Sequence, residues 1–306
     1  MQKKIKARNN FKLTTCALCQ SSTDLRNSHI VPKFAFDWLK RTSGTGYLRL
    51  GSNVNKREQD GFKEHMLCGD CEQLFSNWEG PAASNIFGPV HDDQIELEYG
   101  DWFYQFAKSV CWRILFTYRQ IGLSSFPEKM IHRIDDTIEN WRQELLANDS
   151  TDNTTEFHCF TLGPIEQTDF TNLPPSINRY FLRAIDTDVI HNSTEVMVYA
   201  KLARLVIIGT LQRSADKEWV NTQICPSGDT LKRHVEMSGD IGEFLIHKAG
   251  EYHSLINSFS NKQMNKLSDA MMADVDKTAN SASFGAMYHD VQLFGRDAFA
   301  PPDSAE

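Results

Sequence analysis

The sequence predicts an α+β protein, in which a small cysteine-rich module precedes a larger domain of helices flanking a mostly antiparallel sheet. Three observations lead to this fold class. Two Cys-x-x-Cys pairs stand within residues 14–80, apolar residues recur at helical spacing between 101 and 147, and short β-branched runs follow between 156 and 224. Helical patterns return after residue 230, so the predicted strands lie between helical segments of the chain.

The composition indicates a globular chain of about two domains. It has 306 residues, of which 41% are hydrophobic and 24% charged. No apolar run approaches the ~20 residues that a membrane-spanning helix needs. The basic N-terminus is not followed by the apolar stretch of a secretory signal, so we expect a cytoplasmic protein without a membrane anchor.

The charge is distributed unevenly along the chain. The net charge is −8, but residues 1–80 hold 13 Lys and Arg against 8 Asp and Glu, a net of +5. The remaining residues hold 19 basic and 32 acidic side chains, a net of −13. The N-terminal part can therefore face a polyanion, whereas the acidic remainder is poorly suited to one.

Four segments follow from these patterns. Residues 1–13 are expected to form a basic flexible arm, and residues 14–80 the cysteine-rich module. Residues 81–100 carry Gly, Pro and Asp and are interpreted as a connector. Residues 101–306 are expected to form the α+β domain, with a role in target recognition or regulation.

Within the module, the polar stretch 41–61 contains many turn residues, which predicts a long loop with a short strand at 47–50. A short helix is expected from Cys71, because apolar residues follow it at helical spacing. In the larger domain, residues 101–147 are expected to form an apolar helix followed by an amphipathic helix. The strands are expected in the runs FHCFTL, EVMVYA, ARLVIIGTLQ and EWVNTQI.

The two cysteine pairs carry the strongest chemical signal. Cys16, Cys19, Cys68 and Cys71 can supply four thiolates to one tetrahedral Zn²⁺, because two residues between ligands let one turn present both sulfurs. The pairs are separated by 48 residues, so the segment between them must hold structure of its own. A redox role is disfavoured, since neither pair sits in a thioredoxin-like strand–helix pattern. The chain has seven cysteines and no secretory signal, which also argues against a disulfide framework.

With CALC, SHIVP and LCGDC in this order, residues 14–80 resemble the HNH endonucleases, which are His-Me finger nucleases often built on a zinc-stapled treble clef. The resemblance covers about a fifth of the chain. It implies a ββα module in which a Mg²⁺ or Mn²⁺ ion lies beside a histidine that activates water to cut a phosphodiester bond.

The resemblance assigns candidate roles to three residues. His29 matches the general base, since a neutral imidazole can accept a proton from water. Glu72 stands where the family usually has a histidine, and it can serve as an oxygen ligand for Mg²⁺ or Mn²⁺. Glu79 lies two helical turns further on the same face, so the two carboxylates are expected to bracket an ion site opposite the His29 segment. Each residue also has a structural alternative. His29 can be a merely exposed histidine, Glu72 a carboxylate that stabilises the helix N-terminus, and Glu79 a solvated charge at the helix end.

Two departures from the family pattern favour a zinc module without catalytic activity. Position 28, where the family has a metal-binding Asp or His, is Ser28, and Lys63–His65 stand where the family has an asparagine. The expected function is a metal-dependent HNH-like endonuclease acting on DNA, or alternatively on RNA. From the resemblance we also expect a bacterial antiviral or mobile-element context and a regulatory partner protein. The alternative function is a non-catalytic zinc module that binds nucleic acid or a partner protein.

Overall fold

The structure, a computed structural model, describes residues 11–299 except 52, 95, 149–154, 169–171, 193–194, 212–218, 233–234 and 237–238. The chain forms two compact units, each assembled from three separate stretches. The first unit comprises Met1–Lys33, Phe62–Thr161 and Asp186–Met237, and the second comprises Phe34–Gly61, Leu162–Ile185 and Ser238–Glu306. These units differ from the boundaries expected at residues 80 and 100, because both are discontinuous in the sequence. Most of the predicted basic arm, residues 1–10, lies outside the described residues.

A strand pair and a helix form the N-terminal part of the first unit. Strands β1 (Arg26–His29) and β4 (Lys63–Leu67) pair antiparallel, with Ser28 opposite Glu64 and His29 opposite Lys63. Helix α2 (Gly69–Pro81) begins directly after Cys68. The predicted ββα order is therefore present, with the second cysteine pair at the start of its helix.

The predicted connector is largely helical. A π-helix, η1 (Ala82–Phe87), continues from α2, followed by α3 (Gly88–His91) and the short strand β5 (Glu98–Tyr99). Strand β5 pairs with β10 (Asp229–Thr230), and the turn before β10 contains Gly228 at φ +92°. A Cβ atom at Gly228 would lie 2.5 Å from the carbonyl oxygen of Tyr99, so this close approach needs glycine.

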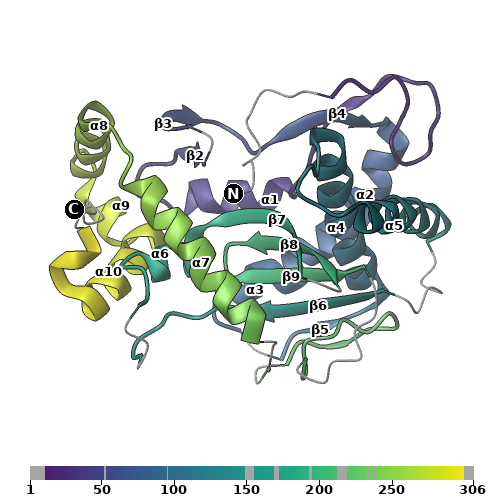
Figure 1. Cartoon of the computed structure of the whole chain (residues 1–306). Coiled ribbons are helices and arrows are strands. Elements are labelled where there is room, and N and C mark those ends of the chain that lie inside the picture. Colours follow the sequence, from purple (N-terminus) through teal and green to yellow (C-terminus); the bar gives the residue numbers. More distant parts are fainter. Residues whose placement is uncertain are drawn as a thin grey trace. The chain divides into compact units, whose positions relative to one another are not determined.

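A four-stranded sheet forms the core of the first unit (Figure 1). Its strands run in the order β6 (Glu156–Thr161), β9 (Leu205–Thr210), β8 (Val196–Leu202) and β7 (Ile185–His191). The β6–β9 and β8–β9 pairs are antiparallel, which confirms the predicted sheet type. Every residue of β8 and β9 is buried, so these strands do not alternate between buried and exposed positions.

Helices α4 (Asp101–Ile121) and α5 (Glu128–Ala147) complete this core. Helix α4 contacts β6, β8 and β9 on one side and α2 and α5 on others. Fourteen of its residues are buried, and Trp112 of α4 and Trp141 of α5 are both fully enclosed. Helix α4 is therefore buried on nearly all sides and lies at the centre of this core.

Three local predictions differ from the structure. In the run EWVNTQI, the described residues 219–224 form no strand; their backbone instead bonds along β6, with the carbonyl of Thr222 accepting from the amide of Cys159 at 2.7 Å. Strand β7 was not predicted, because its sequence IDTDVIH has little apolar periodicity. The predicted loop 41–61 holds the expected strand β2 (Leu48–Leu50) but also a partner, β3 (Asn53–Glu58), whose polar sequence lacks a strand signal.

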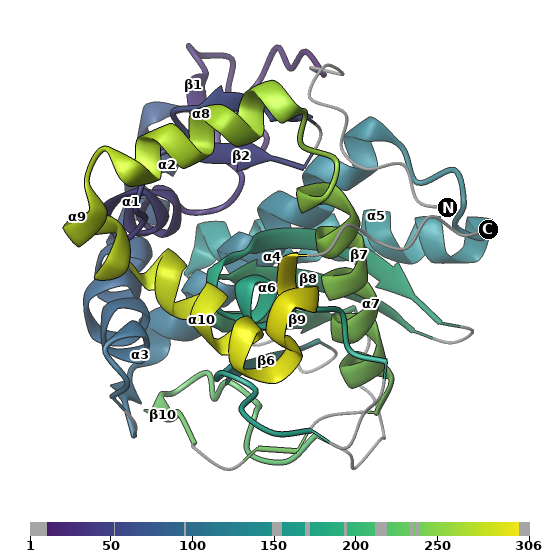
Figure 2. The same ribbon diagram turned by 90° about the vertical axis from the view of Figure 1, so that its left-hand side faces the viewer.

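The second unit is mainly helical (Figure 2). Its elements are α1 (Lys33–Arg41, of which all but Lys33 belongs here), the β2–β3 hairpin, α6 (Ile177–Arg183), α7 (Gly239–Ile256), α8 (Asn261–Met272), α9 (Val275–Ala279), α10 (Ala282–Phe294) and η2 (Gly295–Phe299). A small core forms around Ile177, Tyr180 and Ala249. The fully buried Asp290 of α10 accepts from the amides of Asn178 and Arg179, which fixes the start of α6.

Within the described ranges, no helix combines the length and the apolarity that crossing a bilayer requires.

Candidate functional site

Four cysteines meet at one end of the β1–β4–α2 module. The sulfur atoms of Cys16, Cys19, Cys68 and Cys71 all lie within 4.8 Å of one another. The distance between Cys19 Sγ and Cys68 Sγ is 3.7 Å. Four thiolates around an ion at ~2.3 Å stand about 3.8 Å apart, so this spacing suits a tetrahedral metal site. The predicted ligand set is therefore brought together and can hold a metal ion.

Local backbone geometry positions the sulfur atoms. Gln20, directly after the first pair, has a positive φ of 62°, and its amide bonds to the Cys16 carbonyl at 2.8 Å. The amide of Cys68 donates to Cys16 Sγ at 3.3 Å, which ties the helix start to the N-terminal turn. Backbone amides directed at sulfur favour the thiolate form, as a metal ligand requires.

Burial makes these thiolates costly without a cation. Cys16, Cys68 and Cys71 are buried, and burial raises the pKa of Cys16 and strongly raises that of Cys71. Burial also acts to raise the pKa of the less buried Cys19, but hydrogen bonds, first from the Ser21 hydroxyl, lower it to about 6. A divalent ion removes this penalty because a coordinated thiol is deprotonated outright.

The candidate base His29 lies at the end of β1, partly buried. Its main-chain carbonyl accepts a hydrogen bond of 3.0 Å from Nη1 of Arg113, on α4. Arg113 is 4% exposed, its Nε donates to the carbonyl of Ser109, and its guanidinium lies 5.1 Å from the ring centre of Phe75 on α2. A buried arginine from another part of the sequence thus holds the strand end that carries His29.

Glu79 of α2 is the ionic partner of Arg113. Its Oε1 lies 2.7 Å from Nη2 of Arg113, close enough for an ion pair although the two groups are not aligned as a hydrogen bond. The exposed fractions of the two side chains are 21% and 4%. Glu79 was expected beside a catalytic ion, whereas the structure gives it this ion pair; Arg113 connects it to the carbonyl of His29.

Ser28 has a structural partner on each side of its hydroxyl group. Its Oγ accepts from the amide of Leu67 at 3.1 Å and donates to the carbonyl of Arg26 at 3.3 Å. These two hydrogen bonds lie next to the point where the β1–β4 register shifts, between Arg26 and Asn27. The residue that departs from the family pattern therefore completes the hairpin.

Two other carboxylates of the module have buried oxygen atoms without a hydrogen-bond partner. They are Oε1 of Glu64, which is 4% exposed on β4, and Oε1 of Glu72, in the first turn of α2. Burial raises the pKa of Glu64. Unsatisfied buried carboxylate oxygens are costly, and a bound water or cation would offset that cost. Glu64 was not among the predicted site residues, because a single glutamate in a polar run gives no signal of burial.

The predicted catalytic residues are not gathered into a preformed ion site. Across the described part of the chain, the four cysteines form the only group of three or more His, Cys, Asp or Glu ligand atoms close enough to share an ion. His29, Glu72 and Glu79 therefore do not form such a group in this conformation.

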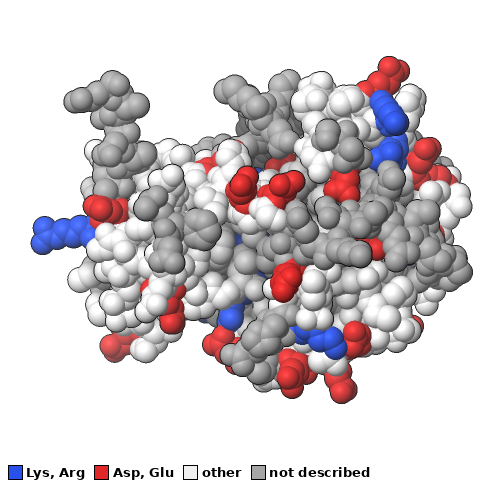
Figure 3. Space-filling model, turned by 60° about the horizontal axis from the view of Figure 1, so that its bottom comes forward, with Lys and Arg blue, Asp and Glu red and all other residues white. Residues whose placement is uncertain are grey.

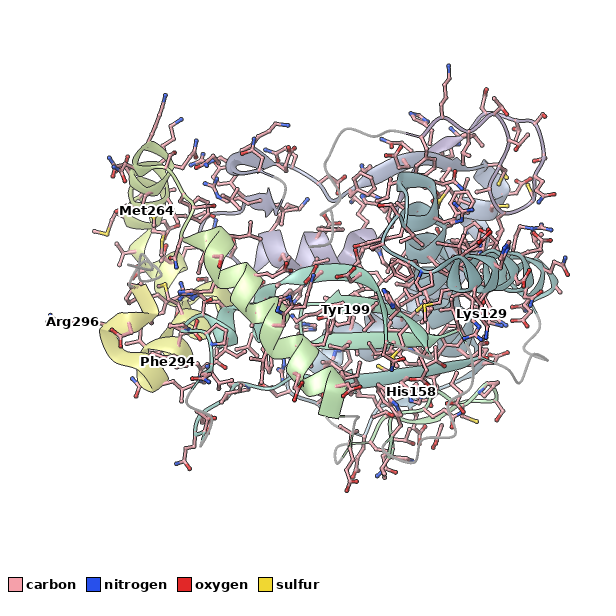
Figure 4. All side chains as sticks on the ribbon, in the orientation of Figure 1. Lys129, His158, Tyr199, Met264, Phe294 and Arg296 are labelled. Atoms are coloured by element: carbon pink, nitrogen blue, oxygen red, sulfur yellow. The ribbon has the colours of Figure 1, made fainter. Side chains whose placement is uncertain are left out.

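A second buried polar cluster lies on β6 and was not predicted. His158, labelled in Figure 4, is 2% exposed and its Nδ1 lies 3.0 Å from the hydroxyl of Thr222. Its Nε2 is 3.5 Å from Oε2 of Glu156, and its ring lies 4.4 Å from that of Trp219. Burial lowers the pKa of His158 to about 4. The cluster comes from the edge of the sheet and a segment over 60 residues further on, so no local pattern could reveal it.

Because folding lowers the pKa of His158, we expect the free energy of unfolding to decrease in acid. Its ordinary pKa is about 6.5, so the unfolded chain binds a proton between pH 6.5 and 4 that the folded chain does not. Stability is therefore complete above pH 6.5 and falls toward pH 4, by up to about 3 kcal/mol from this residue. Urea unfolding at several pH values, with His158→Asn as the control, measures the difference. Equal pH dependence in both proteins would contradict the assignment.

Comparison of the chain with models of protein families, with curated proteins and with solved structures finds no match.

Proposed function

We propose that the chain is a metal-dependent, HNH-like endonuclease that hydrolyses phosphodiester bonds in DNA. One observation supports this best: His29 ends a strand whose antiparallel partner leads directly into a helix that starts at a four-cysteine cluster. This is the order of elements that the resemblance to the HNH endonucleases implies. The cluster is proposed to hold a structural Zn²⁺, because four cysteine sulfurs in a tetrahedral arrangement are the ligands that structural zinc prefers.

The chain's own residues have separate roles in this proposal. His29 accepts the proton of the attacking water through its imidazole. Glu72, with a buried and unpartnered oxygen, is the proposed carboxylate ligand of a Mg²⁺ or Mn²⁺ ion, which when bound would stabilise charge on the phosphate and the leaving oxygen. Arg113, paired with Glu79, holds the main chain at His29 and so positions the base.

The test is cleavage of supercoiled plasmid by the purified protein with Mg²⁺, with Mn²⁺ or with no added divalent ion. Nicking should need the ion, and His29→Ala should slow it by about 100-fold or more, as expected for the loss of a general base. Glu72→Gln keeps the size of the side chain but removes its charge, so half-maximal nicking should need a higher Mn²⁺ concentration. His132→Ala, at an exposed histidine of α5, is the matched control and should leave nicking unchanged.

A specific result would refute each role. If His29→Ala cuts as fast as the parent protein, His29 is not the base. An unchanged metal titration for Glu72→Gln would remove Glu72 from the ion site.

A second candidate function is a non-catalytic metal-stapled module that binds nucleic acid or a partner protein. Two observations favour it: the Ser28 hydroxyl is already bonded within the hairpin, and the described residues outside the cysteine cluster form no preassembled ion site. This candidate predicts no nicking with any ion while the fold and the bound zinc are retained. The regulatory partner and the antiviral context stay predictions.

A further inference from the structure

A group of basic side chains lies on the second unit, where the β2–β3 hairpin meets helix α8. Arg49 of β2 donates to Oε1 of Gln263 on α8 at 3.5 Å, and Arg57 of β3 donates to the carbonyl of Lys266 at 3.4 Å. Asn55 secures the same contact, since its Oδ1 accepts from the amide of Ser260 at 2.8 Å. These bonds place the two arginines beside the first turns of α8.

Two lysines extend this group along the helix. Lys262 and Lys266 are exposed and one turn apart, so they lie on one face of α8. Lys262 directly precedes Gln263, the residue that Arg49 contacts, and Lys266 follows it by three residues on the helix. The four side chains of Arg49, Arg57, Lys262 and Lys266 are here called the basic patch.

Aromatic rings hold the two guanidinium groups of the basic patch. The guanidinium of Arg57 lies 4.1 Å from the ring centre of Tyr47, and that of Arg49 lies 4.9 Å from that of Phe259. Tyr47 is 39% exposed. A stacked guanidinium has lost much of its rotational freedom before binding, so fewer rotamers remain to be fixed by a ligand.

The charges of the basic patch are not neutralised by nearby carboxylates. Within the described residues, none of its four side chains makes an ion pair. The neighbouring Glu58 is paired with Lys56 at 2.6 Å, and α8 contains a single acidic residue, Asp269. The Nε of Arg57 is buried without a hydrogen-bond partner. Repulsion between like charges is thus left uncompensated, in a chain whose net charge is −8.

We propose that the basic patch binds the phosphate backbone of DNA, independently of its sequence. Arginine forks and lysine ammonium groups are the side chains that bind phosphate oxygens, and the patch offers two of each. The inference deepens the proposed nuclease function by assigning a contact surface for its substrate.

The face drawn in Figure 3 differs in charge from the basic patch. The face in Figure 3 carries scattered Asp and Glu side chains, and Lys and Arg form no continuous patch there. Met264, between the two lysines of α8 in sequence, points away from the rest of the helix into the surroundings in Figure 4 and is 49% exposed.

The experiment measures binding of a short fluorescent DNA duplex by anisotropy, with no added Mg²⁺ or Mn²⁺, over a range of NaCl concentrations. The parent protein should bind with an affinity that falls as salt rises. Lys262→Gln with Lys266→Gln should weaken binding by about tenfold and lower the slope of log Kd against log[NaCl] by about 2, one unit for each lost phosphate contact. Arg57→Gln is a separate variant and should lower the slope by about 1.

The matched control removes two basic charges elsewhere on the same unit, by Lys277→Gln with Arg296→Gln, both exposed. Arg296 is labelled in Figure 4. This control should bind DNA like the parent protein. Circular dichroism and melting temperatures of all variants establish that each one is folded.

The proposal is overturned if the parent protein does not bind the duplex, if folded patch variants keep its affinity and slope, or if the control loses as much affinity as they do. Failure of the nuclease proposal has a different signature. If plasmid is never nicked but the patch variants lose DNA binding as expected, the surface stands and the catalytic assignment falls.

Discussion

Replacing Cys71 by serine is expected to abolish metal binding and unfold at least the β1–β4–α2 module. Cys71 is 4% exposed, and its sulfur belongs to a cluster whose ligand atoms all lie within 4.8 Å. Serine is a poor ligand for zinc, and three thiols, two of them buried, would remain without the cation that offsets their burial. Structural zinc contributes on the order of 10 kcal/mol in small modules, which is comparable to the whole stability of a typical domain.

The measurement is zinc content per chain by elemental analysis, together with urea unfolding of the parent and the variant. Cys225→Ser is the matched control: that thiol is half-buried, contacts Ser227 and lies outside the cluster. It should leave zinc content and stability unchanged. A folded Cys71→Ser protein with full zinc content would show that Cys71 is not a ligand.

Replacing Arg113 by methionine is expected to destabilise the first unit by about 3–5 kcal/mol. The substitution keeps most of the apolar stem but leaves the carboxylate of Glu79 without its partner and the carbonyl of His29 without its donor. Removing one member of a buried ion pair costs this much because the other charge stays in a poorly solvated place. If His29 is the base, nicking should fall as well, since the strand end that carries it loses its anchor.

A double-mutant cycle with Glu79→Gln separates the ion pair from the packing of Arg113. The two single changes should not add, with a coupling energy above about 1 kcal/mol. Arg119→Met is the matched control on the same helix, because its ion pair with Asp135 at 2.6 Å is exposed and should contribute less than about 1 kcal/mol. Strict additivity in the cycle would contradict the coupling inferred for Arg113 and Glu79.

The sequence by itself determined the features that depend on short spacing. Each cysteine pair brings two sulfurs together through a local turn, so the four ligands could be named before their geometry was known. The apolar spacing of 101–147 predicted α4 and α5, and the β-branched runs predicted β6, β8 and β9. The helix that follows Cys68 was expected from the apolar spacing after Cys71, and the strand pair was expected from the resemblance to the HNH endonucleases.

Only the tertiary structure decided which polar residues meet. Arg113 and His29 are 84 residues apart, and nothing in an apolar helix indicates that one arginine will be buried against a strand end. The same holds for His158 with Thr222, for the bonds that occupy Ser28, and for the hairpin that brings Arg57 to α8. Periodicity records which face of an element is apolar, but contacts between distant polar groups depend on how the elements pack. The cysteine ligands were therefore predictable, whereas the surroundings of His29 and Glu79 were not.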